Sequence, residues 1–421
     1  MHGQKRDEYK ARLRDSATAK KLALKAQQWH ALSQTLLTRK HASQDSEQTG
    51  QVDVDVDAQK MLETLHLTEK LLAVNPDPIY LWNQRRELLL NSSLPNDGND
   101  NFLEQEQVLT QTALQRNPKA YGAWFHRKWA IRHHLNDNQH QALSDSNSNS
   151  KQILQAELGL CGELLMLDER NFHCWNYRRF IVGIMIDDVI SDGEHFTITD
   201  GEWRLQGLME NKCTVIGAQL TERCASEKSV PVAKKAVSSE VHQLLKLEWN
   251  FTTEKIEQNF SNGSAFHYRS KLLPLLIQLD AASGDDTKTE YFQEELSMIR
   301  NAVFTEPDDQ TSWWYLRFVI SWANPKNEGN CDEDDLQAFQ ATLYEEWSGI
   351  QELVEGEGGK CKWGLLGMHM IASEFCKLEQ GNQYEGENWE QLSRTYLLQL
   401  KELDPDRCRR YDTILVNKDG E

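Results

Sequence analysis

The sequence has little of what marks several large classes of protein. No apolar run approaches the ~20 residues that a membrane-spanning helix needs. Its 46 Lys and Arg are outnumbered by 65 Asp and Glu, for a formal net charge of −19, so the basic face of a nucleic-acid-binding protein is not expected. Runs of alternating β-branched residues, the usual signal for strands, are missing too. We therefore expect an all-α protein with no membrane span and no nucleic-acid partner.

Motifs of metal and nucleotide chemistry are also scarce. The eight cysteines form no C-x-x-C motif and no regular framework, which favours reduced, buried thiols in a cytoplasmic protein. No glycine-rich phosphate loop and no Ser/His/Asp arrangement is present. His133 and His134 are adjacent and cannot share a helix face, and no metal site is expected on this chain. Residues 1–25 are highly charged, unlike a secretory signal.

What the sequence does have is one pattern that recurs six times. An Asn, Asp or Glu begins a pair with Pro, Glu or Phe, and an aromatic follows six residues after the second member. The six aromatics are Trp82, Trp124, Trp175, Phe266, Trp313 and Tyr411. In five copies a basic residue comes three or four places later. Such self-similarity indicates a repeat array.

Each copy is patterned as a helical hairpin. Apolar residues at steps of three and four precede the pair and lie on one helix face. The stripe before the third pair is Leu154, Leu158, Cys161 and Leu165. The residue before a Pro avoids the α conformation, and Asn or Asp is a good N-cap. We therefore expect the first residue of each pair, such as Asn117, to cap the second helix.

The second helix carries the aromatic and the basic residue on one face. We expect the aromatics to wedge between stacked hairpins while the arginines pair with neighbouring carboxylates. The repeat-core set is Trp82, Trp124, Trp175, Phe266 and Trp313. Because one hairpin cannot bury its apolar face alone, stacked copies should form a solenoid. The predicted fold is an all-α, crescent-shaped, right-handed α–α superhelix of helical hairpins.

Composition divides the chain further. Residues 1–58 are expected to form a charged N-terminal arm and loop, and residues 59–421 the repeat solenoid. Trp175 and Phe266 are 91 positions apart, whereas the other neighbours among the first five aromatics are 42 to 51 apart. Since insertions in solenoids form loops between repeats, we expect a flexible insertion at about 184–247.

These repeats resemble those of the protein prenyltransferase α subunits. The sharpest general match is Asn-Pro-Lys-x-Tyr-x-x-Trp-x-x-Arg at residues 117–127. Further stretches resemble the α subunits of the Rab geranylgeranyltransferases in particular. They are residues 168–180, 259–274, 304–313 and the opening Met1-His2-Gly3. The resemblance covers most of the chain, fails in the insertion and is thin past Asn324.

The resemblance implies a heterodimeric enzyme. In this family the α solenoid wraps around a β subunit, a helical barrel that holds the zinc and most of the lipid pocket. Geranylgeranyl is transferred from geranylgeranyl diphosphate to C-terminal cysteines of Rab GTPases, which arrive bound to a Rab escort protein. This chain is thus expected to bind no cofactor, to need its β subunit for activity and to work in the cytoplasm. Some members carry an immunoglobulin-like and a leucine-rich-repeat domain, and neither is expected here.

The resemblance also implies site residues. Lys119 follows the second pair, where we expect the first turn of a helix to offer free N–H groups and a positive dipole end to an anion. The matching Lys of the family reaches the diphosphate, whose developing charge such a donor stabilises. Tyr121, a neutral donor, and His173, one repeat later, are implied to act catalytically beside it. Asn171 is a weaker candidate for the vicinity of the diphosphate.

Two other functions stay open at this point. One is the α subunit shared by protein farnesyltransferase and type I geranylgeranyltransferase, although the stretch at 168–180 favours the Rab enzyme. The other is a non-catalytic, tetratricopeptide-like scaffold, which would have units of about 34 residues with small residues at helix crossings. His2 is a further candidate, as a flexible imidazole that is able to reach the metal of the partner subunit.

Overall fold

The computed structural model describes eight stretches of the chain. They are residues 16–47, 54–90, 102–139, 146–191, 231–283, 287–328, 333–378 and 381–419. Within these stretches the regular secondary structure is helical, with no strand. This confirms the predicted all-α fold class at the level of paired helical hairpins. The chain divides into two compact units, residues 1–205 and 206–421.

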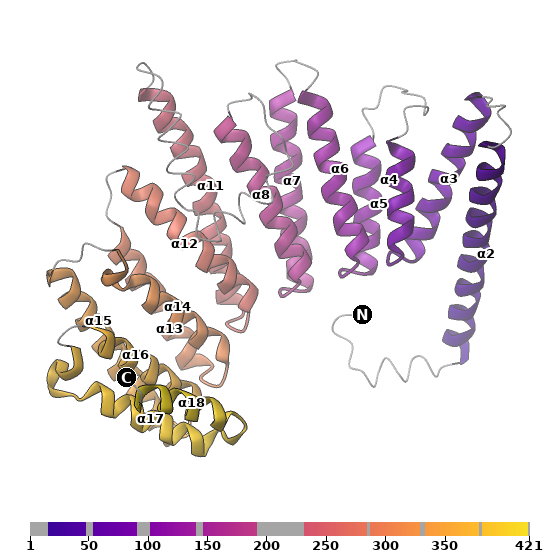
Figure 1. The fold of residues 1–421 in the computed structure, drawn as a ribbon. Helices are drawn as coiled ribbons and strands as arrows, with labels where there is room; N and C mark the ends of the chain where they lie inside the picture. Colours follow the sequence, from indigo (N-terminus) through magenta and orange to yellow (C-terminus); the bar gives the residue numbers. More distant parts are fainter. Residues whose placement is uncertain are drawn as a thin grey trace. The chain divides into compact units, whose positions relative to one another are not determined.

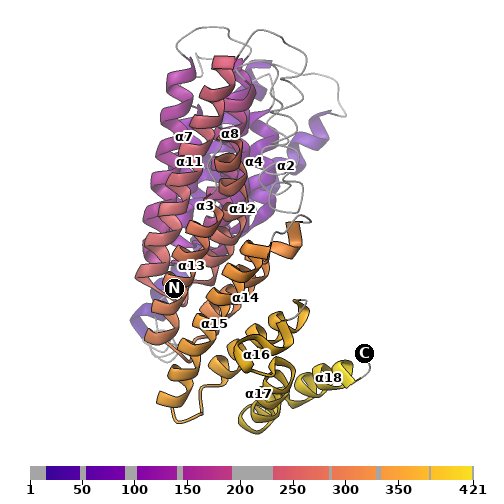
Figure 2. The same ribbon diagram turned by 90° about the vertical axis from the view of Figure 1, so that its left-hand side faces the viewer.

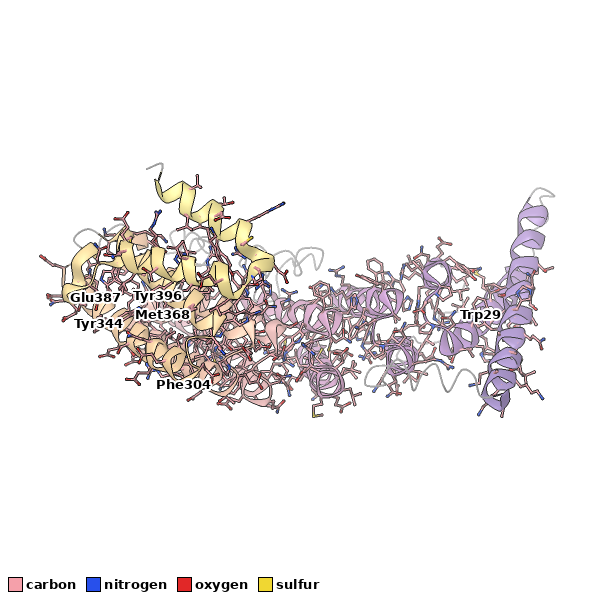
Figure 3. The ribbon with its side chains drawn as sticks, turned by 90° about the horizontal axis from the view of Figure 1, so that it is seen from below. Trp29, Phe304, Tyr344, Met368, Glu387 and Tyr396 are labelled. Carbon is pink, nitrogen blue, oxygen red and sulfur yellow. The ribbon has the colours of Figure 1, made fainter. Side chains whose placement is uncertain are left out.

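The first unit stacks three hairpins behind an N-terminal helix (Figure 1). Its helices are α2 (Ser16–Glu47), α3 (Val54–Val74), α4 (Ile79–Leu89), α5 (Phe102–Arg116), α6 (Tyr121–Gln139), α7 (Ser146–Leu167) and α8 (Phe172–Ser191). The second helices of the hairpins form one row, in which α4 packs on α6 and α6 on α8. Helix α2 joins α3 through Trp29 (Figure 3), whose Nε1 donates to the Leu71 carbonyl at 3.3 Å.

The second unit continues the same alternation (Figure 2). Its longer helices are α11 (Pro231–Gln258), α12 (Gly263–Ser283), α13 (Lys288–Thr305), α14 (Gln310–Ala323), α15 (Glu333–Gly356), α16 (Lys362–Lys377), α17 (Trp389–Leu403) and α18 (Cys408–Asp419). Short 3-10 helices, η2 (Pro325–Glu328), η3 (Gly381–Gly386) and η4 (Pro405–Arg407), lie between them. An aromatic core closes its C-terminal end, where Trp389 stacks on Phe375 with ring centroids 4.1 Å apart. Tyr344 and Tyr396 (Figure 3) both contact Trp347 there, Tyr344 with ring centroids 5.6 Å apart and Tyr396 through its hydroxyl, which accepts from Trp347 Nε1 at 3.1 Å.

The first residue of each repeated pair ends the first helix and does not cap the second. Asn75 and Asn117 each accept a bond on Oδ1 from the backbone N–H two residues later, at 3.2 and 3.1 Å, which is an Asx turn. The second helix begins four residues after the start of the pair. Where a side chain caps it, the cap comes three residues later than expected, as at Asn171 and Asn262. The expected caps were wrong because the chain must first complete this turn.

The constant spacing of the aromatic has a hydrogen-bonding reason. In four copies the Trp Nε1 donates to the backbone carbonyl of the second residue of its own pair, six positions earlier. These bonds measure 2.9, 2.8, 2.7 and 3.1 Å for Trp82, Trp124, Trp175 and Trp313. The four rings and that of Phe266 are at most 4% exposed. These five residues, which we call the wedge aromatics, therefore fill the stack, and the four tryptophans also stabilise the turn that precedes their helix.

The basic residue three places after the aromatic is the buried one. This set is Arg85, Arg127, Arg178 and Arg269, each at most 6% exposed. Arg127 donates to the Gln107 carbonyl and the Thr110 hydroxyl on the first helix of its own hairpin, both at 2.7 Å. It also makes two bonds, of 2.7 and 2.8 Å, to Glu157 on the next hairpin. Arg85 and Arg269 make corresponding sets of bonds, so the arginine joins neighbouring hairpins.

Each of these buried glutamates has a second partner. Glu157 accepts from the Tyr177 hydroxyl, and Glu106 pairs with His126 Nε2, both at 2.7 Å. Burial by itself would raise the pKa of Glu106, but hydrogen bonds from His126 and Arg85 outweigh it and lower that pKa to about 2. Burial lowers the pKa of His126, so its neutral imidazole donates to the carboxylate. We call this contact between neighbouring hairpins the joint: a charged Arg–Glu pair with one neutral hydrogen-bond donor to the glutamate.

Helices occupy more of the two irregular regions than the composition suggested. Helix α2 runs to Glu47 and α3 begins at Val54, so much of the expected arm and loop at 1–58 is helical. Among the α2 side chains that the structure describes, most are exposed and only Ser33 and Leu36 are buried, which is why the composition of this segment is polar. Helices α8 and α11 likewise enter both ends of the expected insertion at 184–247. Residues 192–230 lie outside the described stretches.

Candidate functional site

The candidate residues lie at two neighbouring turns of the first unit, the α5–α6 turn and the α7–α8 turn. Lys119 N–H donates to Asn117 Oδ1 at 3.1 Å, and Ala120 N–H donates to the Asn117 carbonyl at 3.0 Å. Helix α6 begins only at Tyr121. Lys119 is therefore an exposed residue of the turn ahead of α6, and its expected place in the first helical turn was wrong for the reason given for the caps.

Tyr121 and His173 are in direct contact. Their ring centroids are 4.2 Å apart at an interplanar angle of 74°, an edge-to-face arrangement. Phe172 makes a second such contact with His173 at 5.5 Å. Tyr121 is 67% and Phe172 58% exposed. The two turns thus present an open aromatic surface with a single half-buried imidazole in it.

Positive charge surrounds that imidazole. The pKa of His173 is lowered, first by partial burial and then by the charges of Lys119 and Lys128. The His173 ring is consequently neutral near pH 7 and offers one N–H donor. A bound anion would offset the charges of the two lysines and favour the protonated ring. The electrostatics of the two turns therefore favour a negatively charged group.

Asn171 is close to these residues, but its polar atoms are already engaged. The side chain is 1% exposed. Its Oδ1 accepts from the backbone N–H groups of His173 and Cys174, at 3.1 and 3.3 Å, as the cap of α8. Its Nδ2 donates to the Pro118 carbonyl at 3.1 Å. Asn171 ties the two turns together through these hydrogen bonds, and its weaker candidacy for the vicinity of the diphosphate stays a prediction.

The hairpins match a known repeat. A family model described as "Protein prenyltransferase alpha subunit repeat" matches residues 103–134, 154–185, 245–276 and 292–323. Each match spans the two helices of one hairpin. The chain contains prenyltransferase alpha subunit repeats.

Curated relatives of this repeat protein carry one recurring name. The "Geranylgeranyl transferase type-2 subunit alpha" of Bos taurus is 29% identical over 79% of this chain, and that of Homo sapiens is 30% identical over 68%. The chain covers only 44% and 37% of these two proteins. The Saccharomyces cerevisiae protein of the same name is 26% identical over 84% of this chain and 85% of its own length.

Among solved structures, "Candida albicans protein geranylgeranyltransferase-I complexed with GGPP" aligns with 83% of this chain and 82% of its own. The TM-score is 0.46 at 17% sequence identity. A likeness that distant has no bearing on what this chain binds.

In the described stretches, no group of three or more His, Cys, Asp or Glu side chains could hold a metal ion. Nor is any helix in that part of the chain both long and apolar enough to cross a bilayer. His2 lies outside the described residues.

Sequence reasoning about these repeats overlooked Lys128. This residue stands four places after Trp124, one place beyond the buried Arg127, and was grouped with the arginines of the joint. Arg127 and Lys128 have different roles because of their places on the helix. The third position after the wedge aromatic faces the stack, whereas the fourth is half-exposed. Lys128 Nζ lies 5.2 Å from the Phe180 ring centroid, and its charge reaches His173.

Proposed function

We propose that this chain is the α subunit of a heterodimeric Rab geranylgeranyltransferase, active only with its β subunit. The support is the repeat family, the shared name of relatives that align over most of the chain, and the cationic site at the two turns. The observation that supports the site is the contact between the Tyr121 and His173 rings, together with the effect of the Lys119 charge on the pKa of His173. We also place the complex in the cytoplasm, in line with its expected thiol chemistry.

In the proposed reaction a Rab cysteine thiolate attacks the prenyl carbon that bears the diphosphate. A C–S bond forms, the C–O bond breaks, and diphosphate leaves with the bonding electron pair. Zinc on the β subunit would supply the thiolate by lowering the pKa of the cysteine thiol. Lys119 on the α subunit would neutralise the charge that grows on the diphosphate oxygens, and the Tyr121 hydroxyl and the His173 N–H would each donate one hydrogen bond.

Co-expression tests the choice of partner. The full chain is produced with a tagged β subunit of the Rab enzyme or, separately, with that of farnesyltransferase or type I geranylgeranyltransferase. Purified complexes are given geranylgeranyl diphosphate, a Rab GTPase and a Rab escort protein. We expect co-purification and transfer with the first β subunit and no transfer by the α chain alone. Preference for either of the other β subunits would overturn the proposal.

A single substitution tests the site. Lys119→Ala should leave the complex assembled and lower kcat by about 10²–10³-fold, the usual loss when one preorganised donor to a developing anion is removed. Lys70→Ala, at an exposed lysine of α3, is the matched control and should retain full activity. Equal kcat for the Lys119→Ala and Lys70→Ala complexes would exclude Lys119 from the site.

A further inference from the structure

A group of cations and two indoles lies on α14, α16 and the η4–α18 segment of the second unit (Figure 2). Of the two rings, Trp314 is exposed and Trp363 is buried. We call this group the indole–cation patch. Its members are Trp314, Arg317, Lys362, Trp363, Arg407 and Arg410. Trp314 stands one place after the wedge aromatic and is 37% exposed, so it is not part of the buried contacts between hairpins.

Each indole of the patch is flanked by two cations. The guanidinium carbons of Arg317 and Arg410 lie 5.9 and 5.4 Å from the Trp314 ring centroid. Arg407 and Lys362 lie 5.0 and 5.5 Å from the Trp363 ring centroid. The two rings are themselves 6.5 Å apart, edge to face. Stacking on a ring fixes the plane of a guanidinium and leaves its N–H edge free to bind.

The positive charge of the patch is not balanced by the chain. In the described part of the protein only Arg407 has a carboxylate partner, Asp404, at 3.1 Å. Arg317, Arg410 and Lys362 make no ion pair there. The imbalance is notable in a chain with a net charge of −19, where acidic residues are abundant. The three cations without an ion pair, Arg317, Arg410 and Lys362, repel one another, and an incoming anion would remove that cost.

We propose that the indole–cation patch is a docking site for an acidic segment of a partner protein, with Glu or Asp side chains flanking an apolar residue. Arg forks pair bidentately with carboxylates, and the exposed edge of Trp314 offers apolar contact. Trp and Arg are also the residues that most often dominate protein–protein affinity. A nucleic acid fits less well, because the overall negative charge repels a polyphosphate backbone. The inference goes beyond the proposed function and does not depend on it.

Binding of a labelled peptide tests the proposal on the full chain. The probe is a short fluorescein-labelled peptide of Glu residues around one Leu, followed by fluorescence anisotropy at low and at physiological salt. We expect saturable binding that weakens with salt. Arg317→Glu combined with Arg410→Glu should weaken it by about tenfold or more, equivalent to at least about 1.4 kcal/mol.

The control keeps the change in net charge and moves it away from the patch. Lys70→Glu combined with Lys151→Glu, at exposed lysines of α3 and α7, should bind the peptide like the wild type. Trp314→Ala should weaken binding without changing the far-UV circular dichroism spectrum, because the ring is partly exposed. No binding to the wild type, equal losses in the two double variants, or displacement of the peptide by inorganic phosphate at equal concentration would each overturn the proposal.

Discussion

Glu106→Gln should reveal how much one charged joint contributes to the stack. The carboxylate is 1% exposed and accepts two bonds from Arg85, at 2.8 and 2.6 Å, and one from His126. Its pKa falls from the usual 4.5 to about 2, and each pKa unit corresponds to about 1.4 kcal/mol. The charged form therefore contributes about 3 kcal/mol to stability. That value agrees with the loss of about 3–5 kcal/mol when one partner of a buried ion pair is removed.

The sign of the pH dependence follows from the lowered pKa. A carboxyl group with a depressed folded pKa stabilises fully above its unfolded value, near 4.5, and loses this contribution as the pH falls toward 2. The wild type and Glu106→Gln should thus differ most at pH 7 and converge in acid. His126 is present in both proteins, and its lowered pKa also costs stability as the pH falls below its unfolded value. Because Glu106 raises the pKa of His126, the substitution lowers that pKa further, and the measured pH dependence contains both groups.

Urea unfolding followed by circular dichroism between pH 7 and pH 3 measures this difference. Glu104→Gln changes an exposed carboxylate on the same helix and should shift stability by no more than about 0.5 kcal/mol. The reasoning would be refuted by a Glu106→Gln effect below about 1 kcal/mol at pH 7, since a broken buried pair should cost more. A difference that stays constant down to pH 3 would refute it as well.

Three more outcomes are expected. Trp175→Ala should lower stability by about 3–5 kcal/mol, and Trp175→Phe by about 1 kcal/mol because the Nε1 hydrogen bond is lost. If Trp175→Ala unfolds thermally at the same temperature as the wild type, the ring does not fill the stack. Gly122→Ala should destabilise by about 1–3 kcal/mol, because the new methyl would lie 2.3 Å from the wedge ring of the preceding hairpin, whereas Gly159→Ala has open space and should stabilise α7 slightly. Lys119→Ala should raise the pKa of His173, measured by NMR, because a nearby positive charge is removed. An unchanged pKa would show that the charge of Lys119 does not reach His173.

The interval of six residues inside each repeat could be recognised in the sequence because its cause is local. Trp124 binds the carbonyl of Pro118 within one turn and helix start, so a fixed interval of six residues is required wherever the bond is made. The helical hairpins follow from apolar steps of three and four, which are equally local. The sequence predicted that arginines pair with carboxylates. It could not predict which of two adjacent arginines, such as Arg85 and Arg86, is the buried one that forms the pair.

Contacts between hairpins could not be predicted in this way. Asn171 looks like a surface residue of a turn, yet it binds a carbonyl 53 positions earlier. Gly122 stands at the position that His173 holds one repeat later, and it is a glycine because the ring of Trp82 occupies that space. Both facts depend on how one hairpin sits against the next, which no short-range pattern encodes.

The amino-acid order alone determined a helical repeat array, the aromatics that fill it and the family to which its motifs point. Tertiary structure decided which of two adjacent basic residues is buried, where each second helix starts, and that Lys119, Tyr121 and His173 share one surface. The difference is physical: periodicity within a helix is set by neighbours three and four residues apart, while pairing between hairpins is set by contacts between residues 21 to 53 positions apart.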